Sequence, residues 1–267
     1  MRAVLTIAGS DSVAGAGIQA DLKTFAALGV YGTSALTAVT SQNTAGVGDL
    51  FVMPPLVVRS QIECVVQDVA ISAVKTGMLA NAGIVTVVAE ALGHLECRNL
   101  VVDPVMAAAS PGRRTLLAPE AVSILTSQLF PLASVVTPNI SEAGVLAGMV
   151  VESLGAAREA ARRILDLGPK AVVVKGGHLA GAQAIDLLYD GRTFTEFAAP
   201  RSSAVQVHGT GCTFASAIAA GLALGDDLAS AVDRAKRYVT GAIQHAVTIG
   251  DGAALLDHFW NYTDLSA

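Results

Sequence analysis

The sequence predicts an α/β fold in which a mostly parallel central sheet is sandwiched between two layers of helices. Short β-branched runs that look fully buried alternate with longer segments of helical period, as in parallel sheets covered on both faces. The chain has 267 residues, of which 52% are hydrophobic and 15% charged, so it can bury a large core. No linker, internal repeat or low-complexity segment divides it. We therefore predict a single domain over residues 1–267.

Six runs are predicted as buried strands because each is short, apolar and bounded by turn residues. In chain order they are Ala3–Ala8, Thr33–Thr40, Ala73–Lys75, Leu100–Asp103, Ser134–Thr137 and Ala171–Lys175. Two later runs, Ile185–Tyr189 and Thr193–Phe197, are split by Asp190-Gly191, which is a hairpin signal. The hairpin predicts an antiparallel pair at one edge of the sheet.

Amphipathic spacing between these strands predicts the helices. In Gly17–Leu28, for example, Ile18, Leu22 and Phe25 fall on one helical face. Similar spacing predicts helices over Pro55–Val69, Asn81–Leu92, Pro119–Leu129 and Ser153–Leu167, another after Cys212, and a last one from Leu228 to about Ala246.

Composition narrows the function classes. The net charge is −5 and no Lys/Arg run occurs, so nucleic acid is not expected as a partner. No stretch approaches 18 uninterrupted apolar residues, and the N-terminal apolar run is too short for a signal peptide, so no membrane association is expected. Cys64, Cys97 and Cys212 are far apart and lack metal-ligand spacing, which favours reduced thiols in a cytoplasmic protein.

Polar residues follow each of the six predicted strands. Because ligands of such sheets bind beyond the carboxyl ends of the strands, these residues predict one shared site. They are Gly9-Ser10-Asp11, Ser41-Gln42-Asn43-Thr44, Lys75-Thr76-Gly77-Met78, Asp103-Pro104-Val105-Met106, Pro138-Asn139-Ile140-Ser141-Glu142 and Lys175-Gly176-Gly177-His178.

The segment from His208 to Thr213 predicts an anion pocket. Gly209 and Gly211 allow a tight turn, and the small residues that follow predict a helix whose first N–H groups point at one spot. A cysteine at a helix N-terminus tends toward thiolate, so Cys212 is predicted to have a lowered pKa, with His208 beside it. The alternative is a glycine turn before a packed helix, with a buried, inert cysteine.

Two common phosphate-binding motifs are not fulfilled. Gly15-x-Gly17-x-x-Ala20 has the local form of a dinucleotide fingerprint, but the next strand region, Thr33–Asn43, holds no Asp or Glu for a ribose. The Gly-x4-Gly-Lys-Ser/Thr pattern of a P-loop does not occur. Phosphate binding is therefore assigned to Gly209, Thr210, Gly211 and Cys212.

These motifs together resemble the ribokinase-like kinases, and within them the hydroxymethylpyrimidine/phosphomethylpyrimidine kinases of thiamine biosynthesis. The resemblance runs from about Ala3 to Phe259. It rests on Ala8-Gly9-Ser10-Asp11, Gly15-Ala16-Gly17-Ile18-Gln19-Ala20-Asp21, Gln42-Asn43-Thr44, Lys75-Thr76-Gly77-Met78-Leu79, Asp103-Pro104-Val105-Met106, Thr137-Pro138-Asn139, Lys175-Gly176-Gly177-His178 and His208-Gly209-Thr210-Gly211-Cys212-Thr213.

The resemblance implies ATP-dependent phosphorylation of 4-amino-5-hydroxymethyl-2-methylpyrimidine and then of its monophosphate. It implies a ribokinase-like sandwich and a homodimer. It also implies a pyrimidine site lined by Gly9, Asp21, Gln42, Met78 and Val105. An amide such as Gln42 can donate to and accept from an aminopyrimidine edge at once.

The same resemblance implies how ATP and Mg²⁺ are held. Asp103 and Glu142 would organise the magnesium ion and its waters, and Asn139, Lys175, Gly177 and His178 would border the nucleotide. The N–H groups of the Gly209–Cys212 turn would stabilise the transferring phosphoryl group. Cys212 is the candidate proton acceptor, and His208 either assists it or only caps the helix.

The chain departs from the family pattern where relatives have a lysine and this sequence has Ala109. Arg113 or Arg114 is predicted to take over the charge of that lysine. Two alternatives to the pyrimidine kinase stay open: a pyridoxal kinase of the same architecture, and a catalytically weak pyrimidine-binding regulatory protein. Gln42-Asn43-Thr44 favours the pyrimidine kinase over the pyridoxal kinase.

Overall fold

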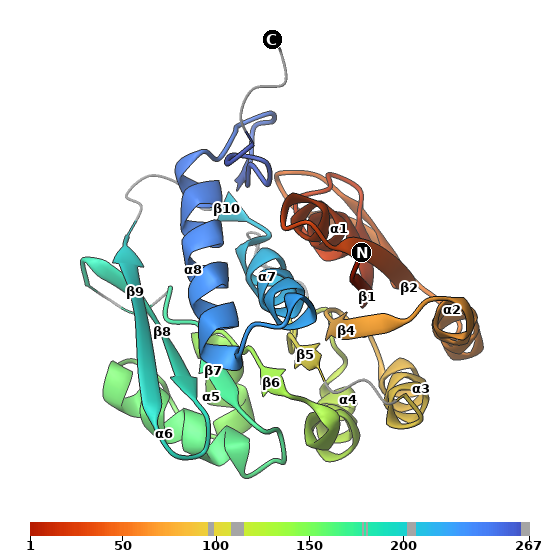
Figure 1. Ribbon diagram of the computed structural model, residues 1–267, viewed down its shortest axis with the longest axis horizontal. Helices are drawn as coiled ribbons and strands as arrows, with labels where there is room; N and C mark the ends of the chain where they lie inside the picture. Colours follow the sequence, from red (N-terminus) through yellow and green to blue (C-terminus); the bar gives the residue numbers. More distant parts are fainter. Residues whose placement is uncertain (96–98, 108–114, 178, 180, 202–206, 263–267) are drawn as a thin grey trace.

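A nine-stranded sheet forms the middle layer of the protein, in the spatial order β3-β2-β1-β4-β5-β6-β7-β8-β9 (Figure 1). The computed structural model describes residues 1–95, 99–107, 115–177, 179, 181–201 and 207–262. The pairs from β2 through β1 and β4 to β7 are parallel, whereas β3, β8 and β9 join antiparallel. The predicted α/β fold with a mostly parallel sheet is confirmed.

The strands are short, and most are apolar on both faces. Their bounds are β1 Ala3–Asp11, β2 Tyr31–Gln42, β3 Val47–Val52, β4 Ile71–Thr76, β5 Leu100–Val102, β6 Val135–Val136, β7 Val172–Val174, β8 Gln183–Tyr189 and β9 Phe194–Pro200. A separate parallel pair joins β10, Val207–His208, to β11, Ala254–Leu255.

Helices cover both faces of the sheet, as predicted. Their bounds are α1 Gly17–Ala27, α2 Pro55–Asp68, α3 Ala82–Gly93, α4 Pro119–Ile124, α5 Ile140–Ala147, α6 Leu154–Leu165, α7 Thr210–Leu224 and α8 Leu228–Gln244. After α4 the chain continues as a π-helical turn, Leu125–Leu129, and a 3₁₀ turn, Phe130–Leu132.

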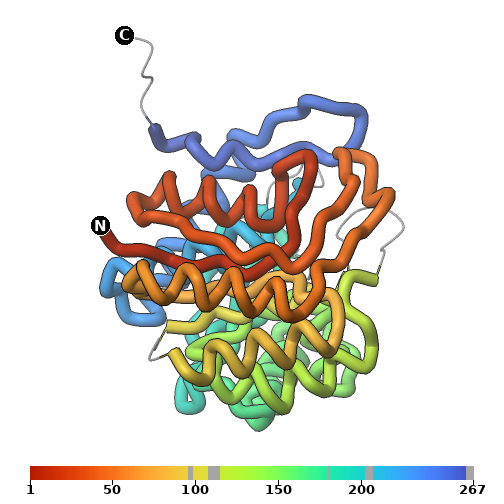
Figure 2. The backbone as a smooth tube through the Cα atoms, turned by 90° about the vertical axis from the view of Figure 1, so that its right-hand side faces the viewer, coloured from red at the N-terminus to blue at the C-terminus, as the bar shows by residue number. Residues whose placement is uncertain are grey.

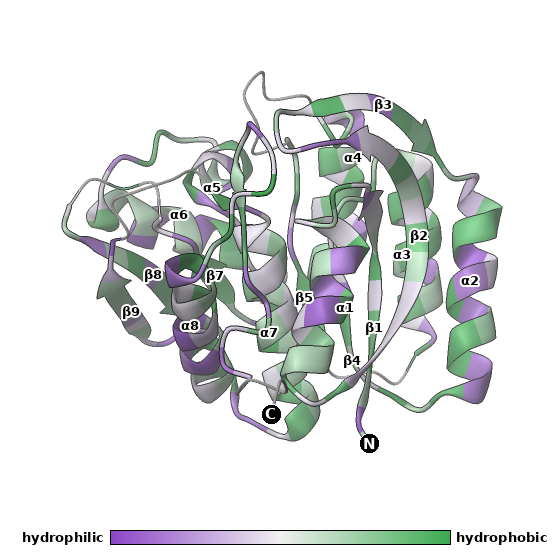
Figure 3. Ribbon diagram, turned by 90° about the horizontal axis from the view of Figure 1, so that it is seen from above, coloured by the Kyte–Doolittle hydropathy of each residue, from purple (hydrophilic) through white to green (hydrophobic). Residues whose placement is uncertain are grey.

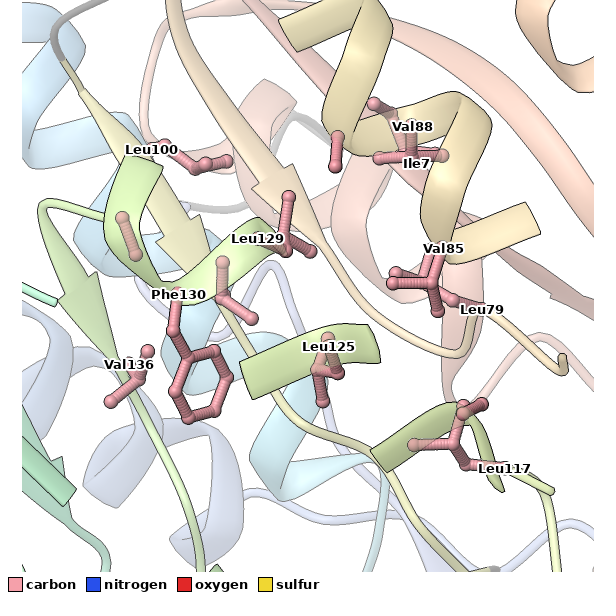
Figure 4. Packing of buried hydrophobic residues seen from close by; sticks show 14 of the residues in the cluster. Ile7, Leu79, Val85, Val88, Leu100, Leu117, Leu125, Leu129, Phe130 and Val136 are labelled. Carbon is pink, nitrogen blue, oxygen red and sulfur yellow. The ribbon is translucent and has the colours of Figure 1, made fainter. Parts of the chain in front are cut away.

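Successive side chains of the central strands point alternately into two separate hydrophobic cores, one on each face of the sheet. Val102 and Val136 belong to the core on the face covered by α2 to α6. Figure 4 shows Val136 there with Leu129 and Phe130. The strand neighbours Val101 and Val135 point to the opposite face, which α1, α7 and α8 cover. This two-residue period places apolar side chains in both layers, as expected for a doubly covered parallel sheet.

Helix α7 is the central helix of its layer, with contacts to both α1 and α8. Most of its residues are buried, whereas α8 carries hydrophilic residues along one side (Figure 3). The many alanines of α7 allow this close packing because their side chains are small. The position of the α7 N-terminus is therefore fixed by surrounding structure.

Three elements differ from the sequence expectation. Strand β3 was not predicted, because its polar Asp49 and its exposed alternate residues make it look like a loop. Helix α5 was not predicted, since its eight residues are too few for a clear helical period. The predicted helix over Pro119–Leu129 is α-helical only as far as Ile124.

The C-terminal segment lies across elements from the other end of the chain (Figure 2). Ala253 N–H donates to the Thr44 carbonyl at 2.9 Å, and β11 pairs with β10 directly before α7. The buried His258 ring lies 3.1 Å from Thr213 Oγ1 in the first turn of α7. Burial, with help from the Lys23 charge, lowers the pKa of His258 to about 4, so the ring is neutral at pH 7.

Candidate functional site

One large cavity of about 1050 Å³ lies at the carboxyl ends of the parallel strands. That position is where ligands bind in sheets of this type. Most residues predicted for the site do line this cavity: Gly9, Gln42, Met78, Asp103, Val105, Asn139, Glu142, Lys175, Gly177, His208, Gly209, Thr210, Gly211 and Cys212. The structure thus brings together residues from six strand ends and from the start of α7.

Among the predicted site residues that the structure describes, Asp21 is the exception, because it is fully buried and does not line the cavity. Both of its carboxylate oxygens bind the Lys75 ammonium, at 2.8 and 2.9 Å, and this lysine is also fully buried. Thr6 and Ser216 hydroxyls donate to the same carboxylate at 2.6 Å each. The position of Asp21 corrects its predicted role in lining the pyrimidine site: it ties β1, β4 and α7 together behind the cavity.

Breaking this buried ion pair is expected to destabilise the fold. Lys75→Met leaves the Asp21 carboxylate without its cation, and removal of one partner of a buried pair costs about 3–5 kcal/mol. Urea unfolding measures the loss. The control is Arg237→Met, since Arg237 pairs with Asp233 at 3.0 Å on the surface and such pairs contribute below about 1 kcal/mol. Equal midpoints for both variants would contradict the assigned role of Lys75.

The turn before α7 brings backbone donors to the cavity. Gly209 adopts φ +86° and ψ 2° as the N-cap of α7, which begins at Thr210. The first N–H groups of a helix have no partner inside the helix, and they lie at the positive end of its dipole. The Gly209–Cys212 segment therefore has the left-handed turn and the helix N-terminus on which the predicted anion site rests.

The Cys212 thiol does not have the lowered pKa that the sequence predicted. Burial raises its pKa to about 11, and the nearby Asp21 and Asp103 carboxylates act in the same direction. The Lys75 ammonium and a backbone hydrogen bond with Gly17 oppose this shift without cancelling it. The prediction was wrong because burial of the thiol is the largest effect on its pKa.

The Lys175 ammonium lies beside the Gly209–Cys212 turn. Its Nζ lies 2.7 Å from Asp103 Oδ1, and a Cβ placed on Gly211 would lie only 3.1 Å from the same nitrogen. Burial lowers the pKa of Lys175, but the Asp103 and Glu142 carboxylates raise it by more, so its pKa lies above the usual value and the ammonium stays charged. A fixed positive charge therefore lies beside the helix N-terminus.

Glu142 and Asn139 form a capping box at the start of α5. Asn139 Oδ1 accepts from Glu142 N–H at 2.9 Å, and Glu142 Oε2 accepts from Asn139 N–H at 2.8 Å. Burial raises the pKa of Glu142 to about 7, with the Lys175 ammonium opposing and Asp103 adding to the rise. A cation added to the cavity would stabilise the ionised form of Glu142 and lower its pKa.

At the opposite wall of the cavity, Asp11, His208 and Gln42 are in contact. His208 Nε2 lies 2.9 Å from Asp11 Oδ2 and 2.9 Å from the terminal amide of Gln42. Asp11 also accepts backbone N–H bonds from Val13, Gly15 and Ala16 at 2.8 to 3.1 Å. This cluster joins the ends of β1 and β2 to β10.

A second buried ion pair supports the Lys175 loop. Lys236 Nζ on α8 donates to Asp186 Oδ2 at 2.8 Å, and Asp186 Oδ1 accepts from Gly176 N–H at 2.9 Å. This pair was not predicted from the sequence, and neither was the pairing of Lys75 with Asp21. In the sequence, such a pair shows only as a charged residue inside an apolar segment, as in Ala73-Val74-Lys75. Its partner lies 50 or more residues away, so the pairing itself cannot be identified from the local sequence.

Several sequence predictions lie outside the described residues. They concern His178 as a nucleotide contact, Ala109 as the replaced lysine, Arg113 and Arg114 as substitutes for it, and Cys97. Within the part of the chain that the structure describes, no group of three or more His, Cys, Asp or Glu side chains could hold a metal ion. In the same residues, every helix is too short or too polar to cross a membrane.

The sequence matches known proteins over nearly its whole length. Residues 11–257 match the family model described as phosphomethylpyrimidine kinase. A hydroxymethylpyrimidine/phosphomethylpyrimidine kinase of Haemophilus influenzae is 47% identical over 270 residues, which cover 99% of this chain and 99% of the relative. A thiamine biosynthesis bifunctional protein of Geobacter sulfurreducens is 50% identical over 96% of this chain, which spans only 52% of that longer protein.

Solved structures agree with the sequence matches. A pyridoxal kinase from Staphylococcus aureus, in complex with AMP-PCP and pyridoxal, has a TM-score of 0.90 at 38% identity, covering 98% of this chain and 94% of that one. A phosphomethylpyrimidine kinase from Clostridium difficile 630 has a TM-score of 0.80 at 43% identity, covering 91% of this chain and 100% of that one. On the extent and identity of these matches, the chain belongs to the phosphomethylpyrimidine kinase family.

Proposed function

We propose that this chain transfers the γ-phosphoryl group of ATP to 4-amino-5-hydroxymethyl-2-methylpyrimidine and then to its monophosphate. The observation that carries the proposal is one cavity lined by Gln42 and Met78, near β2 and β4, by Lys175 and Glu142, near β7 and β6, and by the α7 N-terminus. We assign the first pair to one end of the cavity and the second pair to the other. A heteroaromatic ring fits the first end and a polyphosphate fits the second. The hydroxymethyl group and the γ-phosphate then meet at the Gly209–Cys212 turn.

The phosphate end supplies positive charge and backbone donors. Phosphoryl transfer has a loose transition state with charge on the equatorial oxygens, so alignment and fixed donors do most of the work. The N–H groups of Gly211 and Cys212 and the Lys175 ammonium would bind that charge. Asp103, at 2.7 Å from Lys175 Nζ, holds the ammonium in place.

The residues present fit a magnesium ion. Asp103 and Glu142 both line the cavity, and burial together with the Asp103 carboxylate raises the pKa of Glu142, so an added cation would stabilise its charged form. Mg²⁺ keeps several waters and needs only one or two carboxylates besides the phosphates. When bound with ATP, it would neutralise part of the phosphate charge.

An assay of ADP formation tests the proposal. The purified protein is incubated with ATP, Mg²⁺ and, in turn, the aminopyrimidine, its monophosphate and pyridoxal. The proposal expects ADP release that depends on either pyrimidine. Release with pyridoxal alone would favour the alternative, pyridoxal kinase activity, which the likeness to the Staphylococcus aureus structure motivates. ADP formation that no acceptor stimulates would contradict both activities.

Replacing Gln42 by leucine tests the pyrimidine end. Gln42→Leu is expected to leave the polar ring edge unpaired at a cost of roughly 1–3 kcal/mol, which weakens pyrimidine binding. ATP binding should not change, since Gln42 lies at the other end of the cavity. Calorimetric titration with each ligand measures both affinities. Equal weakening of pyrimidine and ATP binding would contradict the assignment.

We also propose a homodimer and a cytoplasmic location for this single kinase domain. The dimer proposal is supported by exposed apolar side chains along β2, β3 and the start of α2, where Val39 and Phe51 are cross-strand neighbours. Tyr31 and Leu56 extend the same exposed set. Free thiols at Cys64 and Cys212 support a reducing compartment. Sedimentation of the wild type and Phe51→Asp measures the oligomeric state.

A further inference from the structure

The contact between Asp11, His208 and Gln42 fixes more than the positions of these side chains. His208 Nε2 lies 2.9 Å from Asp11 Oδ2 and 2.9 Å from the Gln42 side-chain atom placed as the amide nitrogen. The other amide atom of Gln42, placed as Oε1, lies 3.1 Å from Thr40 Oγ1. All four residues line the cavity. Which atoms carry hydrogen follows from the chemistry of their neighbours.

Asp11 determines the state of the imidazole. Its Oδ2 atom already accepts from Gly15 and Ala16 N–H at 3.0 and 2.8 Å, and its Oδ1 from Val13 N–H at 3.1 Å. Although burial raises its pKa, the His208 contact and these N–H groups lower it overall, so the carboxylate is ionised and can only accept. His208 Nε2 must therefore carry its one hydrogen, which is shared between Asp11 Oδ2 and the Gln42 amide atom, and it has no lone pair left with which to accept.

Thr40 makes a second, independent demand. Its Oγ1 atom lies 2.9 Å from the Ser10 carbonyl oxygen, which can only accept a hydrogen bond. The single hydroxyl hydrogen of Thr40 can serve only one of its two contacts, and we assign it to the shorter one, to Ser10 at 2.9 Å against 3.1 Å to Gln42. The remaining lone pairs of Thr40 Oγ1 face the Gln42 amide, so the amide atom on that side must be a donor.

Both demands require the same orientation of the Gln42 amide. An Nε2 atom beside the His208 N–H would set two donors against each other, and an Oε1 atom beside Thr40 would set two acceptors against each other. We infer that Asp11 is a positioning residue that, through His208, holds Gln42 with Oε1 toward His208 and its NH₂ group toward Thr40. In this orientation the amide oxygen and nitrogen of Gln42 exchange places relative to the contacts given above.

The fixed amide sets which ring edge the cavity accepts. After the bonds to His208 and Thr40, the Gln42 oxygen keeps one acceptor position and the nitrogen one hydrogen. A 4-aminopyrimidine matches them, because its amino group donates to the Gln42 oxygen and its ring nitrogen accepts from the Gln42 nitrogen. With the amide fixed, this pairing has only one order of donor and acceptor. The 4-oxo counterpart has a carbonyl acceptor beside a ring N–H, the opposite order. This consequence rests on the proposed function, whereas the amide orientation does not.

The first test needs no ligand. The ¹⁵N chemical shifts of the His208 ring report which nitrogen carries hydrogen. The inference expects hydrogen on Nε2 in the wild type at neutral pH, in a neutral or a charged ring alike, and a loss of that preference in Asp11→Ala. A wild-type His208 with hydrogen on Nδ1 alone would overturn the inference, whatever the protein phosphorylates.

The second test measures selectivity between the two ring edges. Calorimetry gives the ratio of dissociation constants for 5-hydroxymethyl-2-methyl-4-oxopyrimidine and its 4-amino counterpart. We expect this ratio to fall by about tenfold or more in Asp11→Ala and in His208→Ala, because the amide can then turn to suit either edge. The double variant should lose no more than either single one, since the two residues act through one chain of contacts.

His208→Ala keeps the backbone bonds of Asp11, so it stays informative if Asp11→Ala does not fold. The matched control is Asp227→Ala, because Asp227 accepts Ser230 N–H at 2.8 Å at the start of α8, and it is not among the cavity-lining residues. The control should keep the wild-type ratio. Weakening of both compounds by one common factor in Asp11→Ala and His208→Ala would overturn the inference. Failure of the wild type to bind either compound would overturn the proposed function and the selectivity claim, while the ring shifts still decide the amide orientation.

Discussion

Gly209→Ala is expected to lower kcat by at least about 10²-fold, the usual cost of losing fixed donors to a transition state. Gly209 adopts φ +86°, and a Cβ atom there would overlap the carbonyl oxygen of Gly15. The start of α7 must therefore shift away from the β1–α1 turn. The N–H groups of Gly211 and Cys212 move with it and no longer meet the phosphate.

Gly225→Ala separates this effect from ordinary backbone strain. Gly225 ends α7 with φ +101°, and no atom lies within 4 Å of its Cβ position. Its replacement is expected to cost about 1–2 kcal/mol of stability with kcat unchanged, because only the left-handed conformation is penalised. Steady-state kinetics and urea unfolding of both variants measure the two effects. Near-wild-type kcat in Gly209→Ala would contradict a phosphate site at this turn.

Cys212→Ala is expected to lower kcat at pH 9 by about 10²–10⁴-fold, the usual contribution of general base catalysis. The acceptor would be the thiolate, and the pKa of about 11 makes this form scarce at neutral pH. Below that pKa the thiolate fraction rises tenfold per pH unit, so wild-type kcat should rise with pH through the neutral and mildly alkaline range. The variant should lack this rise.

The exposed Cys64 provides the control for Cys212. Cys64→Ala should keep both the rate and the pH profile of the wild type. Because the pKa of Cys212 is raised and not lowered as the sequence predicted, Cys212 should react with an alkylating reagent more slowly than Cys64. A Cys212→Ala variant with wild-type kcat and an unchanged pH profile would show that the thiol takes no proton.

The sequence was sufficient for the layers of the fold because its strands are apolar on both faces. Val101 and Val102, which point into opposite cores, show this property directly. It was not sufficient for the edge strand β3, whose side chains are partly exposed and carry no continuous apolar pattern. Turn residues located the hairpin β8–β9, since Asp190-Gly191 separates two apolar runs.

Most of the cavity lining followed from one physical rule, that parallel strands end at one edge of a sheet. The roles of the charged groups did not follow, because they depend on partners distant in the sequence. Asp21 was read as a ligand contact, yet Lys75, 54 residues away, neutralises it inside the core. For Cys212, the sequence showed the helix N-terminus but not the burial that raises the pKa of the thiol.

The central claim is that one cavity aligns the γ-phosphate of ATP with a hydroxymethyl oxygen at the start of α7. Phosphorus NMR of a reaction containing the protein, ATP, Mg²⁺ and 4-amino-5-hydroxymethyl-2-methylpyrimidine tests it most directly. We predict a new phosphomonoester signal split by two methylene protons, formed with an equal amount of ADP, and then a diphosphate signal. Inorganic phosphate without any phosphorus signal coupled to methylene protons would contradict the claim.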